Sequence, residues 1–289
     1  MAKTFTEKLH KGYAQTMTLR GKLLADEKSQ FQSVKMFDSE RNGRVLVLDD
    51  IVQLTTRDEC AYSEMLTHLP IFEHGNVKRV MIVGGGDIAI AEEALKHKDV
   101  EAVDMVEIDP VVIELSKQHL QEVNGPALKD KRLKIHVEDA FKFLGRKSAK
   151  QRYDLIIADR PDPVGPAMVL FGDTFYTRVR DALAPGGFAC MQNGVPFYQP
   201  DEMTDTLRQM GASFKHHGVY LTVVPTYIGG YMALTWASND AQLGVASRFK
   251  DVAKRFKAAK IKTDYYTPDM HAAAYALPPW IQRLIPSGR

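Results

Sequence analysis

Three consecutive glycines at positions 84–86 mark the strongest local pattern in this sequence. Residues 79–83 before them form a short apolar run that predicts a buried strand, and residues 88–97 after them have a helical pattern. A strand that turns through glycines into a helix lets the backbone approach a nucleoside closely. We therefore expect a nucleoside-binding turn at Gly84 and Gly86, with a tight turn that binds no ligand as the alternative.

The same alternation of strand and helix continues along the chain and defines the fold class. Further strands are predicted at residues 102–108, 133–137, 153–158 and 188–192, and helices at 110–120 and 174–183. Strands and helices that alternate at this spacing predict an α/β fold with a mostly parallel sheet covered on both faces. Two apolar runs at 219–224 and 231–236 flank Gly229-Gly230 and predict a hairpin.

The two ends of the chain have different patterns. Residues 1–57 are predicted to be β-rich, with strands at 31–37 and 44–48, and a helix is expected from residue 58 to about 68, ending before Pro70. Residues 243–260 have apolar residues at helical spacing and a basic opposite face. We interpret this segment as a surface helix with a solvated face, and an anionic partner is the alternative.

Composition excludes several classes of protein. The 289 residues include 38 Lys and Arg against 36 Asp and Glu, a balance that argues against a dedicated nucleic-acid binder. Cys60 and Cys190 are far apart, so neither a disulfide framework nor a thiolate metal site is expected. The chain shows no apolar leader and no run of about 18 apolar residues. We expect a soluble, cytoplasmic protein with no metal and no membrane or nucleic-acid partner.

Acidic residues follow several of the predicted strands. Glu107 ends the strand after the glycines, 23 positions beyond Gly84, where nucleotide-binding sheets place a carboxylate for the ribose hydroxyls. Gly84, Gly86 and Ala89 also fit G-x-G-x-x-A, which NAD enzymes share. However, Asp87 stands where a pyrophosphate would lie, and Asp139 follows the third strand. A positively charged nucleoside, such as a sulfonium, fits these acids better.

The second strong pattern is the segment at residues 159–166, with the sequence Asp-Arg-Pro-Asp-Pro-Val-Gly-Pro. Asp159 and Asp162 lie three positions apart in a segment stiffened by three prolines. Paired acids held in this way could bind a cationic amine or accept its proton. A solvated acidic loop is the alternative.

Taken in order, these and other motifs resemble those of the spermidine synthases, the polyamine aminopropyltransferases. The matching stretches are Val47-Leu48-Asp49, Val52-Gln53, Arg57-Asp58-Glu59, Tyr62-Ser63-Glu64-Met65, Gly84 to Asp87, Val106-Glu107-Ile108-Asp109, residues 153–166, Pro225-Thr226-Tyr227 and residues 265–271. The resemblance implies a small N-terminal β domain (residues 1–70) on a Rossmann-like, methyltransferase-type catalytic domain (residues 71–289). It also implies a homodimer or homotetramer.

The family moves the aminopropyl group of decarboxylated S-adenosylmethionine to a polyamine acceptor, most often putrescine, which yields spermidine and 5′-methylthioadenosine. The donor is a co-substrate, and no prosthetic group is implied. By resemblance, Asp162 is the general base, Tyr62 and Tyr227 orient the amine, and Asp159 lines the same place.

On the donor side, the resemblance implies one role for each of several polar residues. Asp87 would hold the donor ammonium, Glu107 the ribose, and Asp139 the adenine side. Gln32 and Gln53 would contact the donor and its neighbourhood.

Six residues at four places in the chain depart from the family pattern. Ile88 replaces a glycine after Asp87 and is expected beside the donor, and Ser63 replaces a His or Gln. Arg160-Pro161 replaces small hydroxyl or thiol residues, so that the Arg160 cation either repels a diamine or points outward. Met168-Val169 stands where Glu-Ser is usual. Two alternatives therefore stay open: an S-adenosylmethionine-dependent amine methyltransferase, and a nucleoside-binding homologue impaired in catalysis.

Overall fold

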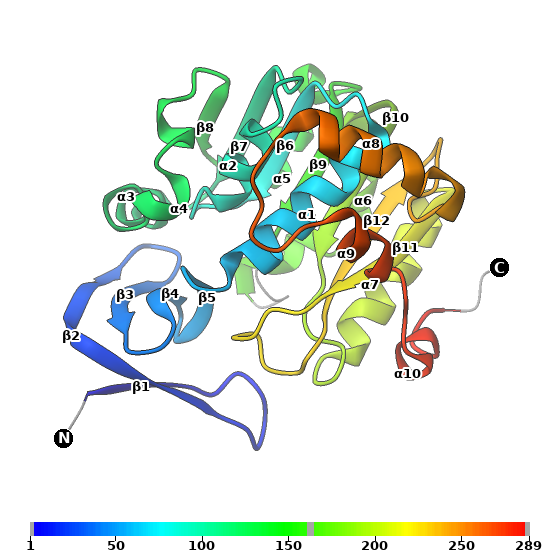
Figure 1. The fold of residues 1–289 in the computed structure, drawn as a ribbon. Coiled ribbons are helices and arrows are strands. Elements are labelled where there is room, and N and C mark those ends of the chain that lie inside the picture. Colours follow the sequence, from blue (N-terminus) through cyan, green and yellow to red (C-terminus); the bar gives the residue numbers. More distant parts are fainter. Residues whose placement is uncertain (1–2, 161–164, 287–289) are drawn as a thin grey trace.

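A small antiparallel sheet forms the N-terminal part of the molecule, drawn in blue in Figure 1. The computed structural model describes residues 3–160 and 165–286. The five strands of this sheet pair in chain order: β1 (Thr4–Glu7), β2 (Gln15–Lys28), β3 (Ser33–Ser39), β4 (Gly43–Leu48) and β5 (Ile51–Thr55). The β-rich N-terminal piece is thus confirmed. The long strand β2 had not been predicted, because most of its residues are exposed and give no clear apolar alternation.

The larger sheet has the strand order β11-β12-β10-β9-β6-β7-β8. Neighbouring strands are parallel except at β12, which is antiparallel to β10 and β11. Its strands are β6 (Arg79–Gly84), β7 (Ala102–Glu107), β8 (Leu133–Val137), β9 (Tyr153–Asp159), β10 (Leu183–Gln192), β11 (His216–Thr222) and β12 (Met232–Ser238). The predicted α/β fold and the hairpin near Gly229 are both confirmed.

Helices cover both faces of the larger sheet, so each face has its own apolar core. Val80 and Ile82 of β6 face the core built by α1 (Glu59–His74), α2 (Ala89–Leu95) and α8 (Phe249–Ala259). Met81 and Val83 face the core of α5 (Ala140–Leu144), α6 (Asp173–Ala182) and α7 (Pro200–Ser213). This strict alternation is what a strand buried on both faces requires.

The two sheets are joined through α3 (Pro110–His119), which is followed by α4 (Gln121–Asn124). Val112 and Leu115 of α3 share an apolar cluster with Val34, Met36 and Leu46 of the small sheet. The chain ends with α9 (Pro268–Ala273) and α10 (Pro279–Gln282), and short 3-10 turns lie at Ala127–Lys129, Lys147–Ala149, Gly165–Leu170 and Ala246–Arg248. No helix within the described ranges combines the length and the hydropathy needed to cross a bilayer.

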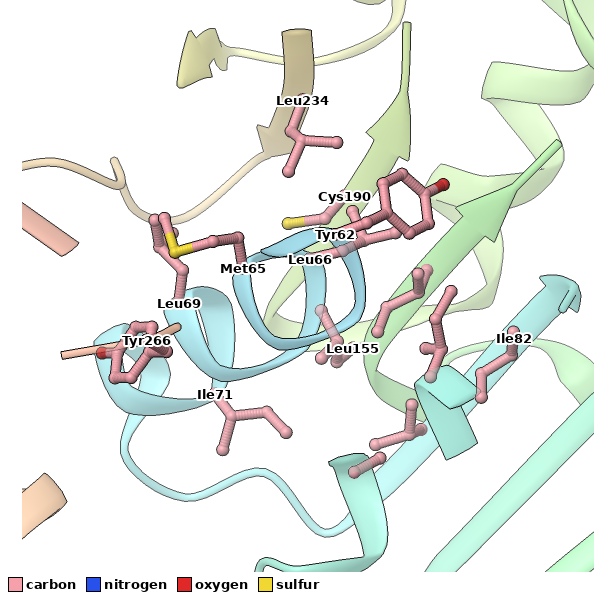
Figure 2. Close-up of a cluster of buried hydrophobic side chains, with 14 of the residues drawn as sticks. Tyr62, Met65, Leu66, Leu69, Ile71, Ile82, Leu155, Cys190, Leu234 and Tyr266 are labelled. Carbon is pink, nitrogen blue, oxygen red and sulfur yellow. The ribbon is translucent and has the colours of Figure 1, made fainter. Parts of the chain in front are cut away.

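Helix α1 is longer than the sequence predicted. It continues through Pro70 to His74 and ends at Gly75, whose N–H donates to the Ile71 carbonyl. Proline inside a helix costs about 3 kcal/mol. Burial of Met65, Leu69 and their neighbours outweighs that cost, and Figure 2 shows these side chains in the cluster with Leu155 and Cys190. The expected domain boundary at residue 70 therefore falls within α1 and stays a prediction.

Ile88, expected beside the donor, lies instead in the core under α1. Its side chain is fully buried among the residues of α1, α2 and β6. Its backbone is left-handed, with φ of +71°, which is an outlier for a β-branched residue. Core burial therefore holds this residue in a conformation that its backbone disfavours.

Substitutions at Ile88 should separate the stabilisation by core burial from the cost of the left-handed backbone in urea unfolding experiments. I88A is expected to destabilise the protein by about 2–4 kcal/mol because it leaves a cavity. Glycine normally costs about 0.5–1 kcal/mol relative to alanine, but it escapes a left-handed strain of about 1–2 kcal/mol. I88G should therefore be at least as stable as I88A, and an I88G variant clearly less stable than I88A would contradict strain at this position.

Candidate active site

A cavity of about 770 Å³ opens at the carboxyl ends of the parallel strands, beside the small sheet. Strand β6 lies between β9 and β7, so the chain reverses its direction of strand addition at β6. Open α/β sheets bind ligands at such a switch point. The predicted site residues in the cavity wall are Gln32, Gln53, Tyr62, Gly84, Gly86, Asp87, Glu107, Asp139, Asp159 and Tyr227.

Glycine is required in this turn because the backbone passes close to the end of β9 and to Glu107. Gly84 and Gly85 have left-handed backbones, with φ of +79° and +73°. A Cβ on Gly84 would lie 2.1 Å from the Asp159 carbonyl oxygen, and one on Gly86 would lie 3.1 Å from Glu107 Oε2. Any side chain at these positions would displace the neighbouring strand or fill the cavity. The turn also presents Asp87, whose Oδ1 accepts from the Ala89 N–H at 2.8 Å.

A tyrosine and an aspartate from different elements meet in the cavity wall. The Tyr62 hydroxyl on α1 donates to Asp159 Oδ1 at the end of β9, over 2.5 Å. The ring of Tyr227 lies edge-on to that of Tyr62, with centroids 6.0 Å apart, and its hydroxyl donates to the Gln53 carbonyl. Side chains more than 160 positions apart in the sequence are thereby held around one space.

The loop that carries Tyr227 is fixed by a carboxylate at the start of α1. Asp58 Oδ2 accepts from both the N–H and the hydroxyl of Thr226 at 2.8 Å, and Asp58 Oδ1 accepts from Thr55 at 2.5 Å. Because Asp58 is buried, these bonds are shielded from water. They tie the end of β5, the start of α1 and the Tyr227 loop together.

The residues expected on the donor side have well-defined partners. Glu107 Oε1 accepts from the Asp109 N–H at 2.8 Å, and Gln32 Nε2 donates to Asp109 Oδ2 at 2.9 Å. Asp139 caps α5, with Oδ1 accepting from the Phe141 N–H at 2.8 Å. Gln53 Nε2 donates to the Ile51 carbonyl at 3.3 Å. Asp162 lies outside the described residues.

The carboxylates of Asp87, Glu107 and Asp159 in the cavity resist ionisation. Burial raises the pKa of Glu107 to about 7, and the charges of Asp109 and Asp87 add to the effect. Burial also raises the pKa of Asp159, followed by the charge of Asp87, and burial raises the pKa of Asp87 itself. Cationic groups of a ligand would relieve this desolvation and repulsion, so the site is suited to cations.

Glu59 is a cavity residue to which the sequence assigned no role. It lies one turn before Ser63, whose hydroxyl donates to Glu59 Oε2 at 2.8 Å, and both residues line the cavity. Burial raises the pKa of Glu59 to about 7. The spacing of four residues on a helix that also carries Tyr62 could have revealed it, because such residues share a face.

The sequence left open whether the Arg160 cation repels a diamine or points outward, and the structure shows a buried guanidinium directed neither at the Asp159 carboxylate nor at solvent. The residue is 2% exposed, and its guanidinium donates to the Leu170 carbonyl at 2.5 Å and to the Tyr176 hydroxyl at 3.1 Å. The charge therefore points away from the Asp159 carboxylate, into the layer formed with α6.

Among residues 3–160 and 165–286, no three His, Cys, Asp or Glu side chains are grouped to hold a metal ion.

Comparison with known proteins agrees with this geometry. Residues 59–247 match the family model for the spermine/spermidine synthase domain, and residues 4–56 match that for the spermidine synthase tetramerisation domain. The chain belongs to the spermine/spermidine synthase family. It is accordingly an enzyme, a transferase of the aminopropyltransferase class.

Relatives of similar length support the assignment. A polyamine aminopropyltransferase of Ruegeria is 45% identical over 97% of this chain and 98% of its own length. The enzyme of the same name from Escherichia fergusonii is 40% identical over 99% of this chain and 98% of its own. A spermidine synthase structure in complex with the transition-state analogue AdoDATO has a TM-score of 0.90 at 28% identity, covering 99% of this chain and 96% of that one. The Thermotoga maritima spermidine synthase gives 0.89 at 28% identity, with the same coverage.

The raised pKa of Glu107 gives a stability prediction with a definite sign. Its pKa in the folded state lies above the unfolded value of about 4.3, so the folded state binds more protons between these values. The free energy of unfolding should therefore fall as the pH rises from about 4.5 to 7. E107Q should be more stable than the parent by about 1–3 kcal/mol at pH 8 and similar to it at pH 4.

Urea unfolding at the two pH values measures this difference. The matched control is E40Q, because Glu40 is exposed and is not part of the cavity wall. E40Q should match the parent at both pH values. Equal stability of E107Q and the parent at pH 8 would show that the Glu107 carboxylate carries no burial cost.

Proposed function

We propose that this enzyme transfers the aminopropyl group of decarboxylated S-adenosylmethionine to putrescine, giving spermidine and 5′-methylthioadenosine. The observation that carries the proposal is the set of half-buried carboxylates in one cavity, with Asp87 and Asp159 beside two tyrosines. The donor carries a sulfonium and an ammonium, and the acceptor carries two amines. These are the charges that such a cavity would stabilise.

The donor is proposed to lie along the switch point of the sheet. Glu107 accepts from the ribose hydroxyls, and Asp139 lies on the adenine side with Gln32 nearby. Asp87 holds the ammonium of the donor, a group whose geometry differs in the methyl donor S-adenosylmethionine. Gln53 borders the same region. The low exposure of this wall keeps competing water away from the reacting carbon.

The transfer itself is a displacement. The amine nitrogen forms a bond to the aminopropyl carbon that is attached to the sulfonium sulfur. The bond between that carbon and sulfur breaks, and its electron pair moves to sulfur. The attacking nitrogen must be neutral, although alkyl amines have a pKa of about 10, as in lysine. The Asp162 carboxylate takes the proton, while Tyr62 and Tyr227 orient the amine with Asp159. Holding the two reactants together supplies much of the acceleration.

Product analysis tests this function directly. Purified enzyme is incubated with decarboxylated S-adenosylmethionine or S-adenosylmethionine and a panel of amines, and products are identified by mass spectrometry. Methylthioadenosine with spermidine supports the proposal. Adenosylhomocysteine with a methylated amine would show a methyltransferase instead, and tight donor binding without any product would show a homologue that has lost catalysis.

Substitution of Asp162 tests its role as the base. D162N should lower turnover by about 100-fold or more, because the amide cannot accept the proton. The control is D173N, which changes an acid at the start of α6 outside the cavity wall. D173N should turn over like the parent, and an unchanged rate in D162N would reject the role.

The chain is further proposed to form a homodimer or a homotetramer, with a domain of residues 1–70 and a catalytic domain of residues 71–289. The match of residues 4–56 to a tetramerisation domain supports an assembly. Light scattering should give a molar mass of two or four times 32.4 kDa. A mass of one chain at micromolar concentration would contradict the assembly.

A further inference from the structure

Thr226, the residue directly before Tyr227, has each of its hydrogen-bonding groups bound by the rest of the protein. Its N–H and its hydroxyl both donate to Asp58 Oδ2 at 2.8 Å. Its carbonyl oxygen accepts from Gln15 Nε2 at 2.9 Å. Residues of exposed loops usually leave these groups to water, and such loops are mobile. The position of Thr226 is instead defined by two side chains that come from distant parts of the sequence.

Gln15 reaches this loop from the small sheet. It is the first residue of β2 and lies directly opposite Glu7 of β1 in the antiparallel pair. Its Nε2 donates to Glu7 Oε2 as well as to Thr226, so both amide hydrogens are used. Glu7 is itself fixed, because its Oε1 accepts from the Val52 N–H at 2.7 Å. Two acceptors, a carboxylate and a carbonyl, thus hold the amide of Gln15 in one orientation.

Asp58 holds the same loop residue from the start of α1. Its side chain is buried, and its second oxygen, Oδ1, accepts from the Thr55 hydroxyl at 2.5 Å. A buried carboxylate with both oxygens bound resists movement, because breaking any of these bonds leaves a polar group unsatisfied. The loop between β11 and β12 is therefore fixed both to the small sheet and to α1.

Tyr227 takes its place in the cavity wall from this fixed neighbour. Thr226 and Tyr227 line the cavity, whereas Gln15 and Asp58, which the structure also describes, lie outside its wall. One planar peptide unit joins Thr226 to Tyr227, so a shift of the first residue moves the second. The Tyr227 ring lies edge-on to that of Tyr62, with centroids 6.0 Å apart. A displaced loop would therefore change the spacing of the two tyrosines.

We propose that Gln15 and Asp58 are positioning residues: together they hold Thr226 and so fix the Tyr227 side chain against the amine acceptor. The proposal rests on the proposed function, in which Tyr227 orients that amine. Gln15 lies within the residues that match a tetramerisation domain, so the small sheet takes part in the reaction in addition to any part in assembly. Gln15 and Asp58 act through the loop and contact neither substrate.

The first test compares Q15M with the parent in steady-state kinetics and in nucleoside binding. Q15M keeps the length of the side chain but removes both amide donors. We expect kcat/KM for putrescine to fall about 10-fold or more, since a misplacement of about 1 Å can cost 100-fold in rate. The Kd of 5′-methylthioadenosine and the number of its sites per chain should stay within about twofold of the parent, because Asp87 and Glu107 lie on other elements. A parental kcat/KM would overturn the proposal.

Q282M is the matched control. Gln282 Nε2 also donates to a backbone carbonyl, that of Leu277 at 2.8 Å, and the residue lies outside the cavity wall. Q282M should keep kcat/KM for putrescine within about twofold of the parent. Light scattering on Q15M excludes an effect through assembly, and its molar mass should equal that of the parent. A lower mass, with normal kcat/KM restored at high protein concentration, would overturn positioning.

A double-mutant cycle tests whether Gln15 acts through Tyr227. In Y227A the side chain to be positioned is absent, so adding Q15M should lower kcat/KM for putrescine by less than about twofold. If Q15M costs about 10-fold in the Y227A background as well, Gln15 acts by another route, such as Glu7, and the proposal is overturned.

D58A tests the other side chain that holds Thr226. It removes both acceptor oxygens and should lower kcat/KM per nucleoside site by at least as much as Q15M does, and an unchanged value would overturn the role of Asp58. If D58A does not fold, Q15M decides alone, because Gln15 is only partly buried. A parent enzyme without aminopropyl transfer, or Y227A with parental kcat/KM, would refute the proposed function, whereas parental kinetics in Q15M would overturn the positioning alone.

Discussion

The half-buried carboxylates of Asp87, Glu107 and Asp159, which form no ion pair with any described residue, are the constraint around which the rest of the structure is built. Burial raises the pKa of Glu59 and Glu107 to about 7 and also raises the pKa of Asp159. The negative charge of Asp87 raises the pKa of each of these groups further. Such an arrangement lowers the stability of the free protein above neutral pH. It persists because the two cores on either side of the sheet hold the strand ends in place, and because cationic substrates relieve the repulsion.

Helix α1 connects the apolar core with the cavity wall. Its middle and end are buried against the sheet, as Figure 2 shows for Met65, Leu66 and Leu69. Its first turns carry Glu59 and Tyr62 into the cavity wall. Pro70 is tolerated inside the helix because the buried face compensates the lost backbone hydrogen bond. The same helix therefore provides packing at one end and chemistry at the other.

The sequence predicted the features whose patterns are local. Apolar runs between helices predicted β6, β7 and β9, and acids after them predicted that Asp87, Glu107 and Asp159 would share one cavity, as they do. Two features were missed although local spacing could have shown them: helix α7, with Met203, Leu207 and Met210 at helical spacing, and Glu59, which shares a helix face with Ser63. The direction in which that face turns is set by tertiary packing. No local pattern reports which way a side chain points from a turn.

Ile88 and Arg160 show why departures from a family pattern need the structure for their interpretation. Each follows an aspartate of the cavity directly, so the sequence placed Ile88 beside the donor and left open whether Arg160 repels a diamine or points outward. Ile88 instead packs into the core under α1, and Arg160 packs against Phe171, which precedes α6, and against Phe175 and Tyr176 of α6. Ile88 lies behind the cavity wall, whereas Arg160 borders the cavity and its guanidinium is bound by groups of α6 and α7, and Asp87 and Asp159 remain in the wall. Catalytic chemistry can thus stay within the family while the residues that support the cavity differ.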